Sequence, residues 1–142
     1  MFIGTFDLSM DPKNRIHLPA KVRDVLHSVY EPPLIVTVSD RCLAGYAARQ
    51  WLEKYEKIES EPYTPEKGDL LRAISANAEE CPLKNGRILI PTRLKEYAQI
   101  KRDVVIVGRV KKIEIWSAER YREAVASTPP SELSERIREY GF

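Results

Sequence analysis

The chain has 142 residues, of which 43% are hydrophobic and 31% are charged, a composition typical of globular proteins rather than disordered ones. Its 23 basic and 21 acidic residues leave a net charge of only +2, which excludes a strongly polycationic nucleic-acid binder but allows a locally basic surface. The N-terminus has no basic segment followed by an apolar core, and no apolar run approaches the roughly 20 residues that cross a bilayer, so we expect no signal peptide and no membrane association.

The first part of the chain predicts a strand, a tight turn, a second strand and a helix. Residues 1–10 contain the alternating apolar positions of a half-buried strand. The sequence D-P-K-N at 11–14 is typical of a tight turn, because Asp bonds its own backbone and Asn tolerates positive φ. Residues 16–18 predict a short strand that Pro19 ends, and apolar residues at helical spacing then predict an amphipathic helix that ends before Glu31.

The chain continues with a hairpin and two helices. Residues 34–38 are β-branched and aliphatic, as in a buried strand, and residues 42–46 form its return strand. Residues 47–58 carry an apolar face at helical spacing. Thr64, followed by proline, predicts the capped start of the next helix, and Ser117 predicts a cap of the same kind later in the chain.

This pattern occurs twice. A shift of 72 residues places Arg15 on Arg87, and a shift of 70 places residues 34–36 on residues 104–106. The two-residue difference between these shifts falls between a helix and a strand, where a change in chain length is tolerated. The self-similarity therefore indicates two copies of one small supersecondary unit.

Each copy predicts four short strands, which are too few for a stable closed sheet. Two intertwined copies would supply enough strands for a small closed β-barrel without exposed edges. We therefore predict a mixed α+β fold in which two pseudo-repeated β units form a small barrel with flanking helices. The expected organisation is a first repeat at 5–47, a helical connector at 48–75, a second repeat at 76–119 and a C-terminal helical segment at 120–142.

Both turns carry basic residues, Lys13 and Arg15 in the first and Lys84 and Arg87 in the second. An arginine offers a planar fork of donors that matches phosphate oxygens or the edge of guanine. The structural alternative is that Arg15 bonds Asp11 across its own turn and braces it. The sequence leaves both interpretations of Arg15 open.

The two turns are not equivalent. The first has Asp11 and Asn14, whereas the second keeps Gly86 but has no aspartate. Asn14 and Gly86 occupy matching positions, and both residue types tolerate positive φ, so we expect one shared backbone conformation. We assign a turn-shaping role to all three residues and expect the first turn to be the main contact, although the missing aspartate leaves Arg87 freer for a ligand.

Other polar and aromatic groups favour structural interpretations. We expect His17 to point toward solvent or a neighbouring subunit, and we expect the helix cations to form a solvated face (Lys21, Arg23, Arg93, Lys95). The large aromatic residues are expected in the core or an interface (Trp51, Tyr55, Trp116, Tyr121).

No enzymatic motif is present. The chain has no glycine-rich phosphate loop, no H-E-x-x-H and no G-x-S-x-G. Cys42, Cys81, His17 and His27 do not have the spacing of a zinc finger, so we expect no metal, no cofactor and no small-molecule substrate. The two cysteines are instead interpreted as half-buried thiols of a reducing cytosol.

Several motifs together resemble the MraZ family. They are the start M-F-I-G, the D-x-x-x-R followed by I-x-L-P at 11–19, the C-P-L-K-N-G-R-I-L-I-P at 81–91 and the I-E-I-W at 113–116. The resemblance covers the chain from Met1 to about Ala126 and implies two SpoVT/AbrB-like swapped-hairpin repeats. It departs from the family's D-x-x-G-R in having Asn14 in place of glycine.

The resemblance implies a DNA-binding transcriptional regulator that acts on the promoter of a division and cell-wall gene cluster. Its partners would be double-stranded DNA with repeated boxes and further copies of itself in a ring, in the cytoplasm and associated with the nucleoid. Repetition around a ring makes later contacts effectively intramolecular, which reconciles DNA binding with a net charge of +2. The alternative is a structural or adaptor ring that binds other proteins, suggested by the apolar stripe of Leu133, Ile137 and Tyr140.

Overall fold

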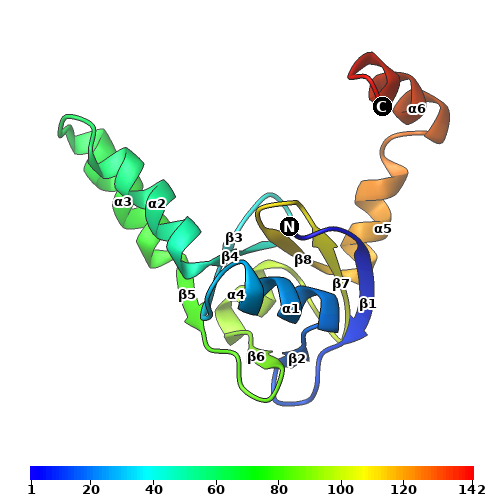
Figure 1. Cartoon of the computed structure of the whole chain (residues 1–142), viewed down its shortest axis with the longest axis horizontal. Coiled ribbons are helices and arrows are strands. Elements are labelled where there is room, and N and C mark those ends of the chain that lie inside the picture. Colours follow the sequence, from blue (N-terminus) through cyan, green and yellow to red (C-terminus); the bar gives the residue numbers. More distant parts are fainter.

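The computed structural model describes residues 1–142 and shows a mixed α+β fold (Figure 1). The strands are β1 (Thr5–Ser9), β2 (Arg15–His17), β3 (Leu34–Val38), β4 (Leu43–Ala47), β5 (Ala78–Cys81), β6 (Arg87–Leu89), β7 (Asp103–Gly108) and β8 (Ile113–Ser117). The helices are α1 (Ala20–Ser28), α2 (Ala48–Glu59), α3 (Pro65–Ala76), α4 (Thr92–Tyr97), α5 (Ala118–Ala126) and α6 (Pro130–Glu139). None of the helices is long and apolar enough to span a membrane.

The strands of the two sequence copies interleave. A six-stranded antiparallel sheet has the order β1-β7-β8-β4-β3-β5, and β2 and β6 form a separate antiparallel ribbon. The first strand of each copy crosses to the other copy, because β1 pairs with β7 and β5 pairs with β3. Neither copy therefore forms its sheet alone.

The expected closed barrel is not confirmed. β1 and β5 are the outer strands of the sheet, and no strand pairing joins them. The mixed α+β class with flanking helices is confirmed.

The core lies between the sheet, the ribbon and the two short helices α1 and α4. In the ribbon, Ile16 and Ile88 face inward and are fully buried. Pro19 and Pro91 precede α1 and α4, and each helix turns an apolar face to this core through Leu26 or Leu94. Proline suits these positions because its fixed φ is compatible with entry into a helix.

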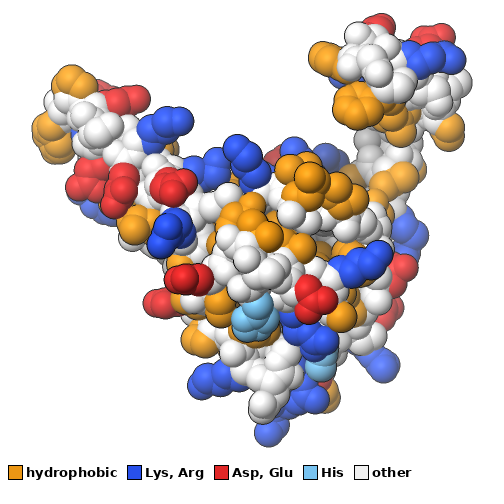
Figure 2. Space-filling view, in the orientation of Figure 1, with side chains coloured by type: hydrophobic (Ala, Val, Ile, Leu, Met, Phe, Trp, Pro, Cys, Tyr) orange, Lys and Arg blue, Asp and Glu red, His pale blue; other side chains and the backbone are white.

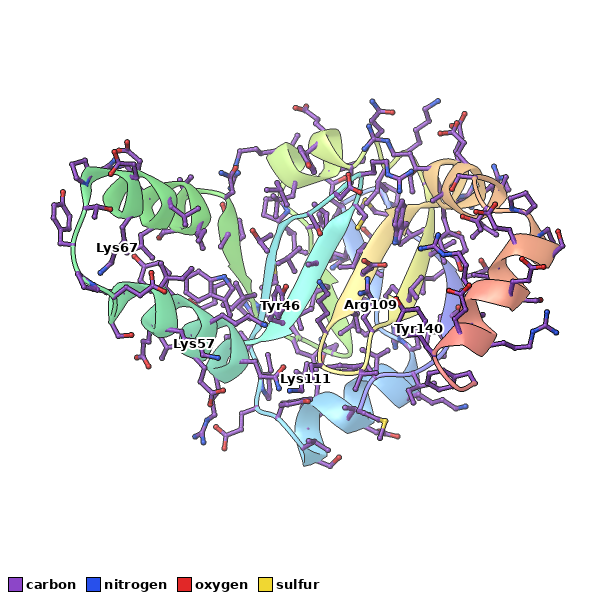
Figure 3. All side chains as sticks on the ribbon, turned by 90° about the horizontal axis from the view of Figure 1, so that it is seen from above. Tyr46, Lys57, Lys67, Arg109, Lys111 and Tyr140 are labelled. Carbon is purple, nitrogen blue, oxygen red and sulfur yellow. The ribbon has the colours of Figure 1, made fainter.

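Two helical arms extend from opposite sides of the sheet (Figures 1 and 3). The α2–α3 pair forms one arm, and α5 with α6 forms the other. The caps predicted at Thr64 and Ser117 are confirmed, since each hydroxyl accepts a hydrogen bond from a backbone N–H in the first turn of its helix. The apolar face predicted for 47–58 lies on α2 and is only half-buried, since α2 has no buried residue, and in α3 only Leu71 is buried.

Candidate nucleic-acid interface

The first turn is organised by the carboxylate of Asp11. Its Oδ1 accepts hydrogen bonds from the backbone N–H groups of Lys13 and Arg15, both at 2.9 Å, and its Oδ2 accepts from Arg15 Nε at 2.7 Å. The N–H of Arg15 is the largest of the influences that hold the pKa of Asp11 below its ordinary value, despite partial desolvation. Asn14 completes the turn with φ of 62°.

The guanidinium of Arg15 is bonded on one side and exposed on the other. Its Nε donates to Asp11, so the bond expected from the structural alternative is present. Its side chain nevertheless stays 37% exposed, and its terminal nitrogens form no hydrogen bond within the chain. The bracing contact therefore orients the guanidinium and leaves its outer edge available to a ligand.

The second turn uses backbone bonds where the first uses an aspartate. Lys84 and Arg87 exchange two N–H···O=C bonds of 2.9 Å, and the two residues between them, Asn85 and Gly86, have φ of 53° and 76°. Two central residues with positive φ define a type I′ hairpin turn, for which Asn-Gly is the preferred sequence. The Asn-Gly pair was the sequence signal for this geometry, and it was missed. The shared positive φ predicted for Asn14 and Gly86 is confirmed.

The two turns lie side by side because the ribbon binds each to the other. The N–H of Leu18 donates to the carbonyl of Gly86, and the N–H of Ile90 donates to the carbonyl of Asn14, both at 2.9 Å. Both turns consequently emerge at the same end of the molecule, below the sheet in Figure 1.

The outer face of the ribbon carries four side chains. Arg15 pairs with Leu89 and His17 pairs with Arg87 across the ladder, while the isoleucine pair between them is buried. Side chains alternate between the two faces of a strand, so these four share the outward face. His17 therefore points outward as predicted. The sequence did not show that His17 would lie opposite Arg87, or that Leu89 would lie opposite Arg15 on the same face.

Cations from the flanking helices reach this face. Arg23 Nη1 lies 2.5 Å from His17 Nε2, and Lys95 Nζ donates to Asn14 Oδ1 at 2.9 Å. A third helix cation, Arg93, pairs instead with Glu79 on β5. Arg93 is exposed, so the predicted solvated face is confirmed for it, whereas Arg23 and Lys95 are half-buried and make contacts that the sequence did not predict.

The resulting surface is basic. The structure brings together the four predicted contact residues and adds two helix cations (Lys13, Arg15, Lys84, Arg87, Arg23, Lys95). Lys13, Lys84 and Arg87 form no side-chain hydrogen bond or ion pair. In Figure 2, Lys and Arg side chains accordingly dominate the lower end of the molecule.

Other reactive groups lie away from this surface. Cys42 and Cys81 are free and buried, and burial raises the pKa of their thiols to about 11 and about 12. They remain protonated at neutral pH and are therefore poor nucleophiles. No three His, Cys, Asp or Glu side chains gather in a way that could hold a metal ion.

Comparison with known proteins identifies the family. The family model described as "MraZ protein, putative antitoxin-like" matches residues 1–72 and 74–137. A "Transcriptional regulator MraZ" of Lachnoclostridium phytofermentans is 37% identical over 100% of this chain and 99% of its own length. The proteins of the same name from Caldicellulosiruptor saccharolyticus and Clostridium beijerinckii are 35% and 40% identical, over 100% and 87% of this chain and 100% and 86% of their own lengths. The chain therefore belongs to the MraZ family.

Proposed function

We propose that this protein is a sequence-specific DNA-binding transcriptional regulator that contacts double-stranded DNA with the β2–β6 ribbon and its two turns. The observation that carries the proposal is the outward ribbon face, where Arg15 and Arg87 lie between two basic turns. The major groove of DNA admits a two-stranded ribbon, and arginine is the commonest reader of guanine. The relatives' printed name, transcriptional regulator, agrees with this role.

The contact residues have distinct roles in this proposal. Arg15 and Arg87 face the bases, and Lys13 and Lys84, at the turns, contact phosphates, which positions the ribbon without reading sequence. Asp11 holds Arg15 in place. Asn14 and Gly86 shape the two turns through their positive φ.

We further propose that copies of the chain assemble head to tail into a ring. The α2–α3 arm holds an open cavity of about 370 Å³ lined mainly by apolar side chains, among them Tyr46, Trp51 and Tyr55. The C-terminal arm presents an exposed apolar stripe on and just after α6 (Leu133, Ile137, Tyr140). Two unlike apolar surfaces on opposite sides of one chain suit a heterologous interface, which forms a ring when the rotation closes.

A ring also explains how a weakly charged protomer binds DNA. Each phosphate contact adds only a salt-sensitive increment, but a ring presents the same ribbon to successive promoter boxes. The swapped repeats at 5–47 and 76–119 build one ribbon per protomer. The family resemblance points to the promoter of a division and cell-wall gene cluster as the target, and to a nucleoid-associated protein of the cytoplasm.

Binding to duplexes tests the proposal directly. Fluorescence anisotropy with DNA from upstream of the protein's own gene, against shuffled DNA of equal composition, is expected to show tighter binding to the native sequence. The logarithm of the binding constant is expected to fall linearly with the logarithm of salt concentration. Equal affinity for both duplexes, or no dependence on salt, would contradict the proposal.

Single variants locate the interface. Arg15→Ala and Arg87→Ala are each expected to weaken specific binding about tenfold or more, since an arginine–guanine pair contributes about 1–3 kcal/mol of discrimination. Lys111→Ala is the matched control, because it removes one exposed positive charge from the β7–β8 turn, at the opposite end from the ribbon (Figure 1). Weakening by the control to the same extent would indicate a general charge effect.

The exposed arms also favour a second candidate, an adaptor ring that binds other proteins. The apolar cavity beside Tyr46 and the stripe around Ile137 are surfaces of the kind that bind protein partners. Partners that remain bound to the purified protein after nuclease treatment, together with no preference for promoter DNA, would favour this candidate.

A further inference from the structure

The ribbon is nearly two-fold symmetric, but its outward face is not. The shift of 72 residues that relates the copies places Arg15 on Arg87 and also places His17 on Leu89. In the ladder, Arg15 lies opposite Leu89 and His17 lies opposite Arg87, so the two arginines occupy diagonal corners of the face. The other two corners of the face are His17 and Leu89, which occupy equivalent positions but differ in chemistry.

The surroundings of these two corners sharpen the difference. His17 lies within hydrogen-bond distance of Arg23 Nη1, at 2.5 Å. The equivalent of Arg23 is Lys95, whose ammonium is bonded to Asn14 and not directed at Leu89. Leu89 is left as a bare apolar side chain that is 53% exposed on a basic surface.

The two corners would recognise different bases. A neutral imidazole offers one donor and one acceptor, and an imidazole with a neighbouring guanidinium can address the polar edge of a purine. A leucine offers no hydrogen bond and fits only an apolar group, which in the major groove is the methyl group of thymine. A reader with two identical halves would instead fit a palindrome and bind it in two equivalent orientations.

We propose that His17 and Leu89 are specificity-determining residues that make each protomer read an asymmetric DNA box in a single orientation. The inference rests on the proposed DNA-binding function and deepens it. It leads us to expect a preference for direct repeats over inverted ones, because copies arranged head to tail would present their ribbons in the same direction. On the outward strand face the asymmetry resides in these two side chains. The two turns also differ, but in the proposed function they contact phosphates, which carry no sequence information.

Selection from a library of random-sequence duplexes, carried out with the full-length protein, tests this inference. The wild type is expected to enrich an asymmetric box. His17→Leu and Leu89→His each make the two corners alike, so each is expected to enrich a box whose halves are inverted repeats. Each is also expected to bind the wild-type box about tenfold more weakly, as for one mismatched base pair.

The double variant H17L/L89H gives the decisive test. It exchanges the two corners, so it is expected to enrich the asymmetric box again and to regain most of the lost affinity. A side chain needed only for folding would not show this rescue. Circular dichroism and the mass in solution check that each variant keeps its fold. The double variant H17N/L89N, which also makes the two positions alike and is expected to enrich inverted repeats, replaces any single variant that does not.

The outcomes separate this inference from the proposed function. If the wild type enriches no sequence, DNA recognition itself is contradicted, and the inference falls with it. If the wild type enriches a palindrome, or if the single variants enrich the unchanged asymmetric box, the roles of His17 and Leu89 are overturned while DNA binding stands.

Discussion

The ammonium of Lys95 donates a 2.9 Å hydrogen bond to the side-chain oxygen of Asn14, which lies 81 residues earlier in the chain. The contact joins helix α4 of the second copy to the turn of the first. At the equivalent place in the second turn, a Cβ on Gly86 would lie only 2.5 Å from Arg23 Nη1. Asn14 and Gly86 share a positive φ, but at Gly86 the guanidinium of Arg23 lies where the Asn14 side chain lies in the first turn.

A double-mutant cycle measures this contact. Asn14→Gly keeps the backbone conformation and removes the acceptor, and Lys95→Met removes the donor while keeping most of the aliphatic stem. The two changes are expected to be non-additive by about 0.5–1.5 kcal/mol, the usual contribution of one hydrogen bond. Urea unfolding at a fixed protein concentration gives the four free energies. Strict additivity would show that the bond contributes nothing to stability.

Asp11→Asn is expected to lower the free energy of unfolding at neutral pH. The amide oxygen can accept from the backbone of the turn, but the ion pair with Arg15 is lost. The pKa of Asp11 is lowered in the folded protein, so its contribution is present above the ordinary value of 3.8 and is lost as pH falls below it. The stability difference between wild type and variant should therefore shrink in acid.

Asp40→Asn is the matched control for this change. Asp40 is an exposed aspartate in the β3–β4 turn, and its carboxylate lies 3.6 Å from Arg41. An exposed pair at this distance contributes little, so the control is expected to leave the unfolding curve nearly unchanged. Equal destabilisation by both variants would mean that Asp11 does not organise its turn specifically.

Local signals in the sequence predicted most of the elements. The strand at 34–38 is found with those bounds, and the caps at Thr64 and Ser117 are confirmed, because such features depend on neighbours only a few residues away. The matched positive φ of the two turns was predictable for the same reason.

The candidate site was predicted less completely. The sequence indicated the two arginines and the lysines as candidates, but not that the turns would be bonded to each other through the backbones of Gly86 and Asn14. Contacts such as Lys95 with Asn14 depend on the pairing register of the two copies, which no short-range pattern specifies. Helical periodicity likewise showed which face of α2 is apolar, but not whether anything in the chain covers it.

Gly108→Ala is expected to destabilise the fold. A Cβ at this position would lie 2.6 Å from the backbone atoms Phe2 C and Ile3 N, and backbone cannot move aside as a side chain can. The N–H of Gly108 also donates to the carbonyl of Gly4 at 2.8 Å, so the N-terminal segment is held against the end of β7. A cost of about 1–3 kcal/mol is typical of such overpacking.

Gly68→Ala provides a control of opposite sign in the same unfolding experiment. Gly68 lies inside α3, where an added Cβ would approach only the flexible ring of Tyr63, at 3.4 Å. Alanine in a helix interior is about 0.5–1 kcal/mol more favourable than glycine. Stabilisation by Gly108→Ala, or the same effect from both variants, would contradict the close approach at Gly108.

Ile137→Glu is expected to break the proposed ring without unfolding the protomer. Ile137 is 43% exposed in the α6 stripe and contributes no contact to the buried core, so the protomer loses little by its replacement. A carboxylate buried in an apolar interface without a partner would be strongly unfavourable. Sedimentation velocity is expected to show a loss of the large species, with an unchanged circular dichroism spectrum.

Ser131→Glu introduces the same charge on α6 outside the apolar stripe and is expected to leave the mass unchanged. Trp51→Ala removes an aromatic wall of the cavity on the other arm, so it should reduce the mass as Ile137→Glu does if the two arms are partners.

Mixing Ile137→Glu with Trp51→Ala offers a further check, since a head-to-tail interface needs one intact surface from each copy. A mixture can form one intact contact between the two variants but cannot extend it, so pairs are expected where the proposed wild-type ring has more subunits. An unchanged mass for both single variants would exclude the arms as the ring contact.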